Sequence, residues 1–315
     1  MLQAAISSDI DTLWSNYKGI GCRRSGGYSY AELRIGLEAF DRFLEPYGIK
    51  ATLFMVGEDF RHACNHEAIR AVAAAGHEIA NHSMTHAQGF RLLSMQEKEA
   101  EIAGMEAQCL EVTNIRPVGF RSPGWNVGDD AVEILKRRGY LYDSSVHPTV
   151  IMPLLKFLHW KSMSSRSAAD RTTMGHLHYM LAPTNPYLCG RGSFGRRGAD
   201  GVMEFPVTVT PRLRLPFFAT FLMASGLPMF QRSLRSLVAA GRPIQFMFHL
   251  SDFVDYRRAD LADQVPTDGD GVYVPQALRM PLEKKLDLFR QAMDMMAEVC
   301  TFKTLQQYAI QGEAR

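Results

Sequence analysis

Residues 3–11 read QAAISSDID, a short run of small and apolar residues that ends in two aspartates. Its length and composition are those of a buried strand, with the acids at the carboxyl end. An amphipathic pattern follows over about residues 30–46, and a near-continuous apolar run covers residues 50–56. Near-continuous apolar strands that alternate with helices are typical of parallel sheets covered by helices. The opening stretch therefore predicts an α/β fold, either a doubly wound sheet or a barrel.

The alternation continues to about residue 145 and resumes over residues 202–253. In both architectures, functional side chains gather at the carboxyl ends of the strands. Polar residues fall at these predicted strand ends, namely Asp9, Asp11, His82, His86, Arg121, Asp143 and His249. The sequence thus predicts one active site at that end of the sheet.

The composition is that of a globular protein, with 46% hydrophobic and 22% charged residues in 315. A net charge of +2 predicts no nucleic-acid partner, because duplex binders usually carry a pronounced basic excess. The five scattered cysteines indicate no disulfide framework, and no signal-peptide pattern or long apolar run is present. We expect a protein that is cytoplasmic, or peripheral on the inner face of the membrane. The composition leaves the oligomeric state open.

One catalytic domain over residues 1–315 is expected, with two less regular parts. Residues 146–200 lack clear periodicity and are interpreted as an insertion that covers the site. The segments 150–160 and 215–230 are more apolar than a barrel requires. Each fits an interfacial element or lipid groove with peripheral membrane contact, or helices that pack the insertion, which is the favoured interpretation.

The chemistry begins with His82-x-x-x-His86. On a helix turn this spacing puts both imidazoles on one face. Alone, such a pair is more often a surface or capping feature. With an aspartate from the Asp9-x-Asp11 pair, it becomes a His, His, Asp ligand set that leaves a position open for water or substrate. Zinc is the expected ion, although cobalt, nickel and iron also suit these ligands.

The remaining strand-end residues fit hydrolysis of an amide or ester. The second carboxylate of Asp9-x-Asp11 can take a proton from water, and His249 can give one to the leaving amine. Arg121 and Asp143 are candidates for holding Asp9 and His249 in the required charge states.

Together these motifs resemble the five ordered motifs of the polysaccharide deacetylase superfamily, also called the NodB-homology or carbohydrate esterase four family. The motifs are the Asp9-x-Asp11 pair, the His82 and His86 pair, residues 120–125 (FRSPGW), residues 142–145 (YDSS) and the apolar strand ending at His249. The resemblance covers residues 3–145 and 202–253. It implies a distorted (β/α) barrel of about seven parallel strands. The Asp-x-Asp form is similar to the branch with peptidoglycan deacetylase-like and allantoinase-like members.

Position by position, the resemblance implies a role for most of the motif residues. Metal ligands would be Asp11, His82 and His86. Asp9 would be the general base, positioned by Arg121, and His249 would be the general acid, supported by Asp143. A backbone N–H near Gly124 would lie in the oxyanion hole. The neighbouring Trp125 is either a wall on which the sugar stacks or a residue of the core.

These assignments favour a metal-dependent enzyme that removes an acetyl or formyl group from an N-acylated amino sugar of a glycan or a lipid-linked precursor. Two alternatives stay open. One is a hydrolase of cyclic amides, imides or allantoin-like ureides on the same fold. The other is an inactive carbohydrate- or lipid-binding module.

Overall fold

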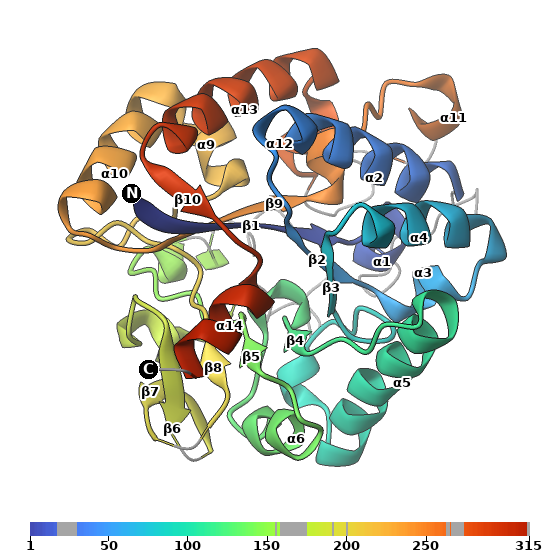
Figure 1. The fold of residues 1–315 in the computed structure, drawn as a ribbon, viewed down its shortest axis with the longest axis vertical. Helices are drawn as coiled ribbons and strands as arrows, with labels where there is room; N and C mark the ends of the chain where they lie inside the picture. Colours follow the sequence, from blue (N-terminus) through green and yellow to red (C-terminus); the bar gives the residue numbers. More distant parts are fainter. Residues whose placement is uncertain are drawn as a thin grey trace.

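The computed structural model describes residues 1–17, 30–154, 156–157, 175–190, 192–199, 201–262, 265 and 274–313. A curled sheet forms its centre (Figure 1). Its strands are, in spatial order, β10 (Cys300–Phe302), β1 (Leu2–Ile10), β2 (Thr52–Met55), β3 (Glu78–Asn81), β4 (Gly119–Phe120), β5 (Tyr142–Asp143), β8 (Met203–Glu204), β6 (Tyr187–Gly190) and β7 (Ser193–Arg197), while β9 (Ile244–His249) pairs with β1.

The strand pairings confirm the predicted α/β fold. The strands β10, β9, β1, β2, β3, β4, β5 and β8 pair with one another in parallel. Among the described strands, the antiparallel pairs are those of β6 with β8 and of β6 with β7. The described residues form eight parallel strands rather than about seven, because Cys300–Phe302 adds a short strand to β1 after the last long helix. The sheet forms an open half-barrel, so the carboxyl ends of its parallel strands converge on one side.

Helices cover the outside of this sheet (Figure 1). The longer ones are α2 (Tyr30–Leu44), α4 (His66–Ala74), α5 (Met95–Thr113), α6 (Ala131–Arg137), α9 (Ala219–Ser225), α10 (Leu227–Ala239), α13 (Leu282–Ala297) and α14 (Leu305–Glu313). Short helices are α1 (Leu13–Tyr17), α3 (Gly57–Phe60), α11 (Ala259–Ala262) and α12 (Gln276–Arg279). Helix α5 begins with a capping box, in which Ser94 and Glu97 satisfy each other's backbone N–H groups.

Aromatic packing fixes helices α2 and α13 against the sheet beside β9. Phe248 of β9 lies 6.2 Å from Phe40 of α2 and 5.1 Å from Phe289 of α13, measured between ring centroids in edge-on arrangements. Such contacts are favoured by the ring quadrupole and contribute beyond simple burial. They fix the strand that carries His249.

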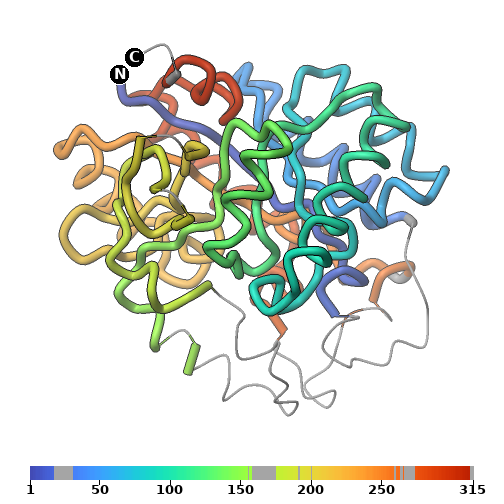
Figure 2. Tube along the Cα trace, turned by 90° about the horizontal axis from the view of Figure 1, so that it is seen from below, coloured from blue at the N-terminus to red at the C-terminus, as the bar shows by residue number. Residues whose placement is uncertain are grey.

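The interpretation of residues 146–200 as a cover is incomplete. Within the described part, β6 and β7 form an antiparallel hairpin that extends the sheet beyond β8. Residues 158–174 of this insertion lie outside the described residues. The start of β1 and helix α14 lie close together at one end of the molecule (Figure 2).

The apolar segment 215–230 packs in the core. Phe217, Leu222 and Phe230 are buried there, and the rings of Phe217 and Phe230 stack at 4.8 Å between centroids. In the segment 150–160 Met152 is buried, whereas Leu154 and Phe157 are exposed. Across the described ranges, no helix has the length and apolarity needed to span a bilayer.

Gly119 gives a first prediction about stability. A Cβ added to it would lie 1.9 Å from Cζ of the buried Tyr142, whose hydroxyl donates a hydrogen bond to Glu78. Since Tyr142 is enclosed, Gly119→Ala is expected to lower the free energy of unfolding by about 1–3 kcal/mol or more. Urea denaturation measures this. Gly241→Ala, where the added Cβ meets open space but φ is +61°, is a control for backbone strain alone. An equal loss in both variants would contradict the packing explanation.

Candidate active site

The two histidines of the motif approach each other from a loop, not from a helix turn. Asn81 ends β3, and residues 82–86 adopt no helical structure. Ser83 and His86 have positive φ values of 67° and 52°, and the ring centroids of His82 and His86 lie 5.1 Å apart. Left-handed conformations in non-glycine residues cost energy and are concentrated at functional sites. The helical interpretation was wrong, although the predicted juxtaposition of the imidazoles is present.

Side-chain hydrogen bonds hold this loop in shape. Asn81 accepts from Ser83 N at 2.8 Å and donates to Ile102 O at 2.9 Å. Glu101 accepts from both the backbone N–H and the hydroxyl of Thr85, at 2.9 and 2.8 Å. The loop is therefore anchored to α5 from two sides, which fixes the direction of both imidazoles.

The donor atoms of Asp11, His82 and His86 fit a divalent metal in type and protonation. His82 Nδ1 lies 2.7 Å from Arg121 O, and His86 Nδ1 lies 3.1 Å from Ser15 O. A carbonyl can only accept, so each Nδ1 carries the proton and each Nε2 keeps its lone pair, as in metal-binding histidines. His86 Nε2 is 3.8 Å from Asp11 Oδ2.

The surroundings of Asp11 also suit a cation. Its Oδ1 is buried and has no hydrogen-bond partner among the described residues, and burial raises the pKa of this carboxyl group to about 7. A buried carboxylate oxygen without a partner is costly unless a cation meets it. Within the described ranges, however, no three His, Cys, Asp or Glu side chains already stand together as a complete ligand set. The residues fit a metal in the chemistry of their donor atoms.

Arg121 is the centre of a buried network around Asp9. Its side chain is fully buried, and Nη1 donates to Asp9 Oδ1 at 2.5 Å. Nε donates to Ser144 O at 2.9 Å, and Nη2 donates to Ser7 Oγ at 3.2 Å. The guanidinium carbon also lies 3.9 Å from the centre of the Phe54 ring, a cation–π contact.

This network sets the charge of Asp9. Burial alone would raise the pKa of Asp9, but Arg121, His82 and His249 together lower it below its ordinary value. Asp9 is therefore ionised at neutral pH, as a proton acceptor must be.

His249 lies next to Asp9 in register, since β1 and β9 pair these two residues. Burial alone would lower the pKa of His249, yet the charges of Asp11, Asp9 and Asp252 raise it above its ordinary value. Asp252 is buried and accepts a hydrogen bond from the backbone N–H of His249 at 2.9 Å. The sequence reasoning missed Asp252, although an acid three residues beyond a strand-end histidine is a usable signal.

Asp143 was expected to support His249, but its carboxylate is hydrogen-bonded to Ser145. Its Oδ2 accepts from Ser145 N and its Oδ1 from Ser145 Oγ, both at 2.8 Å. On the neighbouring strand β8, Glu204 is its register partner, and Glu204 Oε1 accepts from Val146 N at 3.0 Å. Both carboxyl groups are fully buried. The acid beside His249 is Asp252, and a catalytic role for Asp143 stays a prediction.

The Asp143 and Glu204 pair predicts a pH effect on stability. Burial raises the pKa of both groups, and Asp143 raises that of Glu204 further. The folded protein therefore binds more protons than the unfolded chain above the ordinary Glu pKa of about 4.3. The free energy of unfolding should fall as pH rises through this window, by up to about 1.4 kcal/mol per unit for each group.

Glu204→Gln is expected to flatten that decline, because the amide oxygen keeps an acceptor for Val146 N while the ionisable group is lost. Urea denaturation of both proteins at acidic, neutral and alkaline pH gives the comparison. If the free energy of unfolding fell equally with pH in wild type and variant, Glu204 would not be a source of the decline.

Gly124 and Trp125 form a tight turn directly after Pro123. Both have positive φ, 58° and 54°, and Trp125 N donates to Ser122 O at 3.0 Å. Trp125 is nearly buried, with its ring 4.8 Å from that of His147 and 5.7 Å from that of Phe218. Because the Trp125 N–H is used within the turn, Gly124 is the better candidate for an N–H that faces substrate, while Trp125 serves mainly as a packed wall.

Comparisons with known proteins agree with this geometry. The family model for polysaccharide deacetylases matches residues 36–142. A peptidoglycan deacetylase-like protein of Gibberella zeae is 29% identical over 119 residues, which are 36% of this chain and 33% of that protein. The peptidoglycan deacetylase of Helicobacter pylori is 24% identical over 112 residues, which are 36% of this chain and 37% of that one. The matched region thus spans about a third of each of these relatives.

Two solved structures share the fold over nearly the whole chain. One is described as a candidate polysaccharide deacetylase from Mycobacterium smegmatis, with a TM-score of 0.61, 17% identity, and coverage of 99% of this chain and 91% of that one. The other is Puue allantoinase, with a TM-score of 0.57, 15% identity, and coverage of 99% and 90%. At these identities the likeness concerns the fold. The similarity to polysaccharide deacetylases thus rests on the family match over residues 36–142 and on the two relatives, while the solved structures show a shared fold.

Proposed function

We propose that this protein is a metal-dependent hydrolase that removes an acetyl or formyl group from an N-acylated amino sugar. The observation that carries the proposal is the buried ion pair of Arg121 and Asp9, which lies beside His249 and two residues from Asp11 in the chain. A buried, ionised carboxylate next to a histidine with a raised pKa provides a base and an acid in one site. The family match and the two peptidoglycan deacetylase relatives support a sugar substrate.

Asp11, His82 and His86 would hold one divalent metal ion, with zinc the best fit by ligand type, although cobalt, nickel and iron also accept such ligands. When bound, the ion would polarise the acyl carbonyl and make a water molecule more acidic. Asp9 would take the proton from that water, and Arg121 would keep the Asp9 carboxylate ionised and in place.

His249 would then give a proton to the leaving amine. The nearby charges of Asp11, Asp9 and Asp252 favour its protonated form, and the bond from its backbone to Asp252 fixes its position. An N–H near Gly124, which lies in a left-handed turn, would stabilise the oxyanion. The Trp125 indole would border the sugar.

The substrate carrier is either a glycan or a lipid-linked sugar. The exposed Leu154 and Phe157 are compatible with a lipid carrier and peripheral membrane contact, whereas Phe217, Leu222 and Phe230 of the segment 215–230 are buried and not available for it. We further propose action on the cytoplasmic side, as the sequence composition suggested.

The reaction class is tested by measuring free-amine release from the sugars and ring opening of allantoin to its carboxylate product. The purified protein is incubated with N-acetylated sugar oligomers, with formylated or acetylated lipid-linked amino sugars, and with allantoin. Release from an N-acyl sugar supports the proposal. Hydrolysis of allantoin alone would replace the substrate class by a ureide, and tight sugar binding without any release would indicate a binding module.

A further inference from the structure

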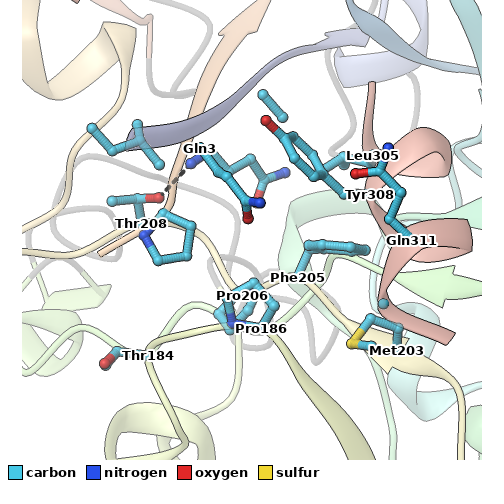
Figure 3. A pocket seen from close by; sticks show the side chains of 15 residues that line it. Gln3, Thr184, Pro186, Met203, Phe205, Pro206, Thr208, Leu305, Tyr308 and Gln311 are labelled. Carbon is cyan, nitrogen blue, oxygen red and sulfur yellow. Dashed lines mark hydrogen bonds between the residues drawn. The ribbon is translucent and has the colours of Figure 1, made fainter. Parts of the chain in front are cut away.

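A hollow of about 160 Å³ opens at the amino-terminal end of the sheet, away from the catalytic candidates (Figure 3). Its walls come from the starts of β1 and β9, the strand β8 with the segment after it, and α14. The register pairs Asp9 with His249 and, five residues earlier on both strands, Ala4 with Ile244. At about 3.3 Å per residue, the hollow therefore lies about 16 Å from the active site.

The lining has a consistent chemistry. None of the 15 lining residues is charged. Prolines and the rings of Phe205 and Tyr308 form flat apolar walls, while glutamines and threonines provide hydrogen-bonding groups (Figure 3). A charged ligand would lose its hydration here without meeting a counter-charge. The lining thus favours an uncharged, flat molecule with a polar substituent.

The hollow is held open by its own hydrogen bonds. The Tyr308 hydroxyl donates to Ala4 O at 3.2 Å and to Thr301 O at 3.1 Å, which ties α14 to the edge of the sheet. On the other wall, Gln245 N donates to Thr208 Oγ1 at 2.7 Å. Ligand sites are usually preformed in this way.

The buried Gln245 is one of the lining residues and connects the hollow to the catalytic network. Its carboxamide is assigned with Oε1 towards Arg121, because this orientation satisfies both ends. Oε1 then accepts from Arg121 Nη2 and from Ser144 Oγ, the latter at 2.8 Å, and Nε2 donates to Phe205 O at 3.1 Å. Arg121 in turn donates to Asp9.

We propose that this hollow binds a compact, uncharged ring compound that carries a carboxamide or hydroxyl group, and that the ligand rests on Gln245. A dry cavity of about 150 Å³ holds benzene in a well-studied case, so a ligand of about ten non-hydrogen atoms suits the volume. Because Gln245 also contacts Arg121, an occupied site should change the surroundings of the Arg121 guanidinium. This site is separate from the proposed reaction, and its binding can be measured without substrate.

The test uses benzamide as the probe and benzoate as a charged probe of the same shape. Saturation-transfer NMR on the full-length protein is expected to show benzamide binding, with benzoate at least about tenfold weaker, a difference of about 1.4 kcal/mol. Gln311→Trp, at the exposed rim on α14, should block the hollow and abolish the signal. Ile310→Trp, its exposed neighbour outside the lining, should leave the signal unchanged.

Occupancy should also shift the Arg121 Nε–H resonance, which is protected by its bond to Ser144 O. Should Gln311→Trp fail to fold, Gln3→Trp at the opposite exposed rim replaces it. The proposal would be overturned if benzamide did not bind, or if benzoate bound equally well. It would also be overturned if the signal survived the blocking variant, if Ile310→Trp lost the signal, or if the Arg121 resonance did not move.

Discussion

Asp9→Asn is expected to lower kcat for amine release by about 10²- to 10⁴-fold, the usual contribution of a positioned general base. The amide side chain of this variant keeps an oxygen that accepts from Arg121, so the geometry changes little, but it cannot take a proton. In the native protein, Asp9 is ionised because Arg121, His82 and His249 lower its pKa against the effect of burial. KM should change far less than kcat, since the loss concerns proton transfer and not substrate binding.

Ser7→Ala is the matched control for Asp9→Asn. Ser7 also accepts from Arg121, at 3.2 Å, but carries no acidic group. Its removal should leave kcat within about tenfold of wild type, because the hydroxyl takes no part in proton transfer and a single hydrogen bond contributes on the order of 1 kcal/mol. Initial rates of free-amine release, measured well below the unfolding temperature of each variant, give the comparison. Full activity in Asp9→Asn would remove Asp9 from the role of base.

Arg121→Met is expected to lower the free energy of unfolding by about 3–5 kcal/mol, the typical cost of breaking a buried ion pair from one side. The side chain is fully buried, and its loss would leave the Asp9 carboxylate without its principal counter-charge. Ser7 and Ser144 would lose a donor as well. Urea denaturation at neutral pH measures the effect.

The double variant Asp9→Leu with Arg121→Met separates stability from activity. Replacing both charges by apolar groups removes the unpaired carboxylate, so most of the lost stability should return. Amine release should stay absent in the single and the double variant, because neither has an ionised and positioned base. Failure of the double variant to recover stability would show that Arg121 stabilises the fold mainly through its other contacts.

Much of the fold follows from local patterns in the chain. The strand ending at His249 is nearly continuous in apolar residues, as is typical of a parallel strand buried on both faces. Ser94 and Glu97 mark the start of α5 through a capping box. The strand β10 was not anticipated, because Cys300–Phe302 is too short to show a period.

The site was predictable where it depends on strand ends, and not where it depends on register or loop conformation. Asp9 and His249 could be placed together since carboxyl ends of parallel strands converge. The spacing of His82 and His86 suggested a helix, whereas a loop with left-handed residues brings the same two positions together. Glu204 was missed since only the register of β5 and β8 places it beside Asp143.

The most direct test of the proposed mechanism is a zinc titration of the metal-stripped protein, with amine release from an N-acetylated sugar oligomer as the readout. We expect negligible release without metal and a plateau at one equivalent of zinc, because Asp11, His82 and His86 would form one site. His82→Ala should stay near the baseline throughout. Equal release by the stripped protein, or a His82→Ala variant that reaches the wild-type plateau, would contradict the proposed metal site.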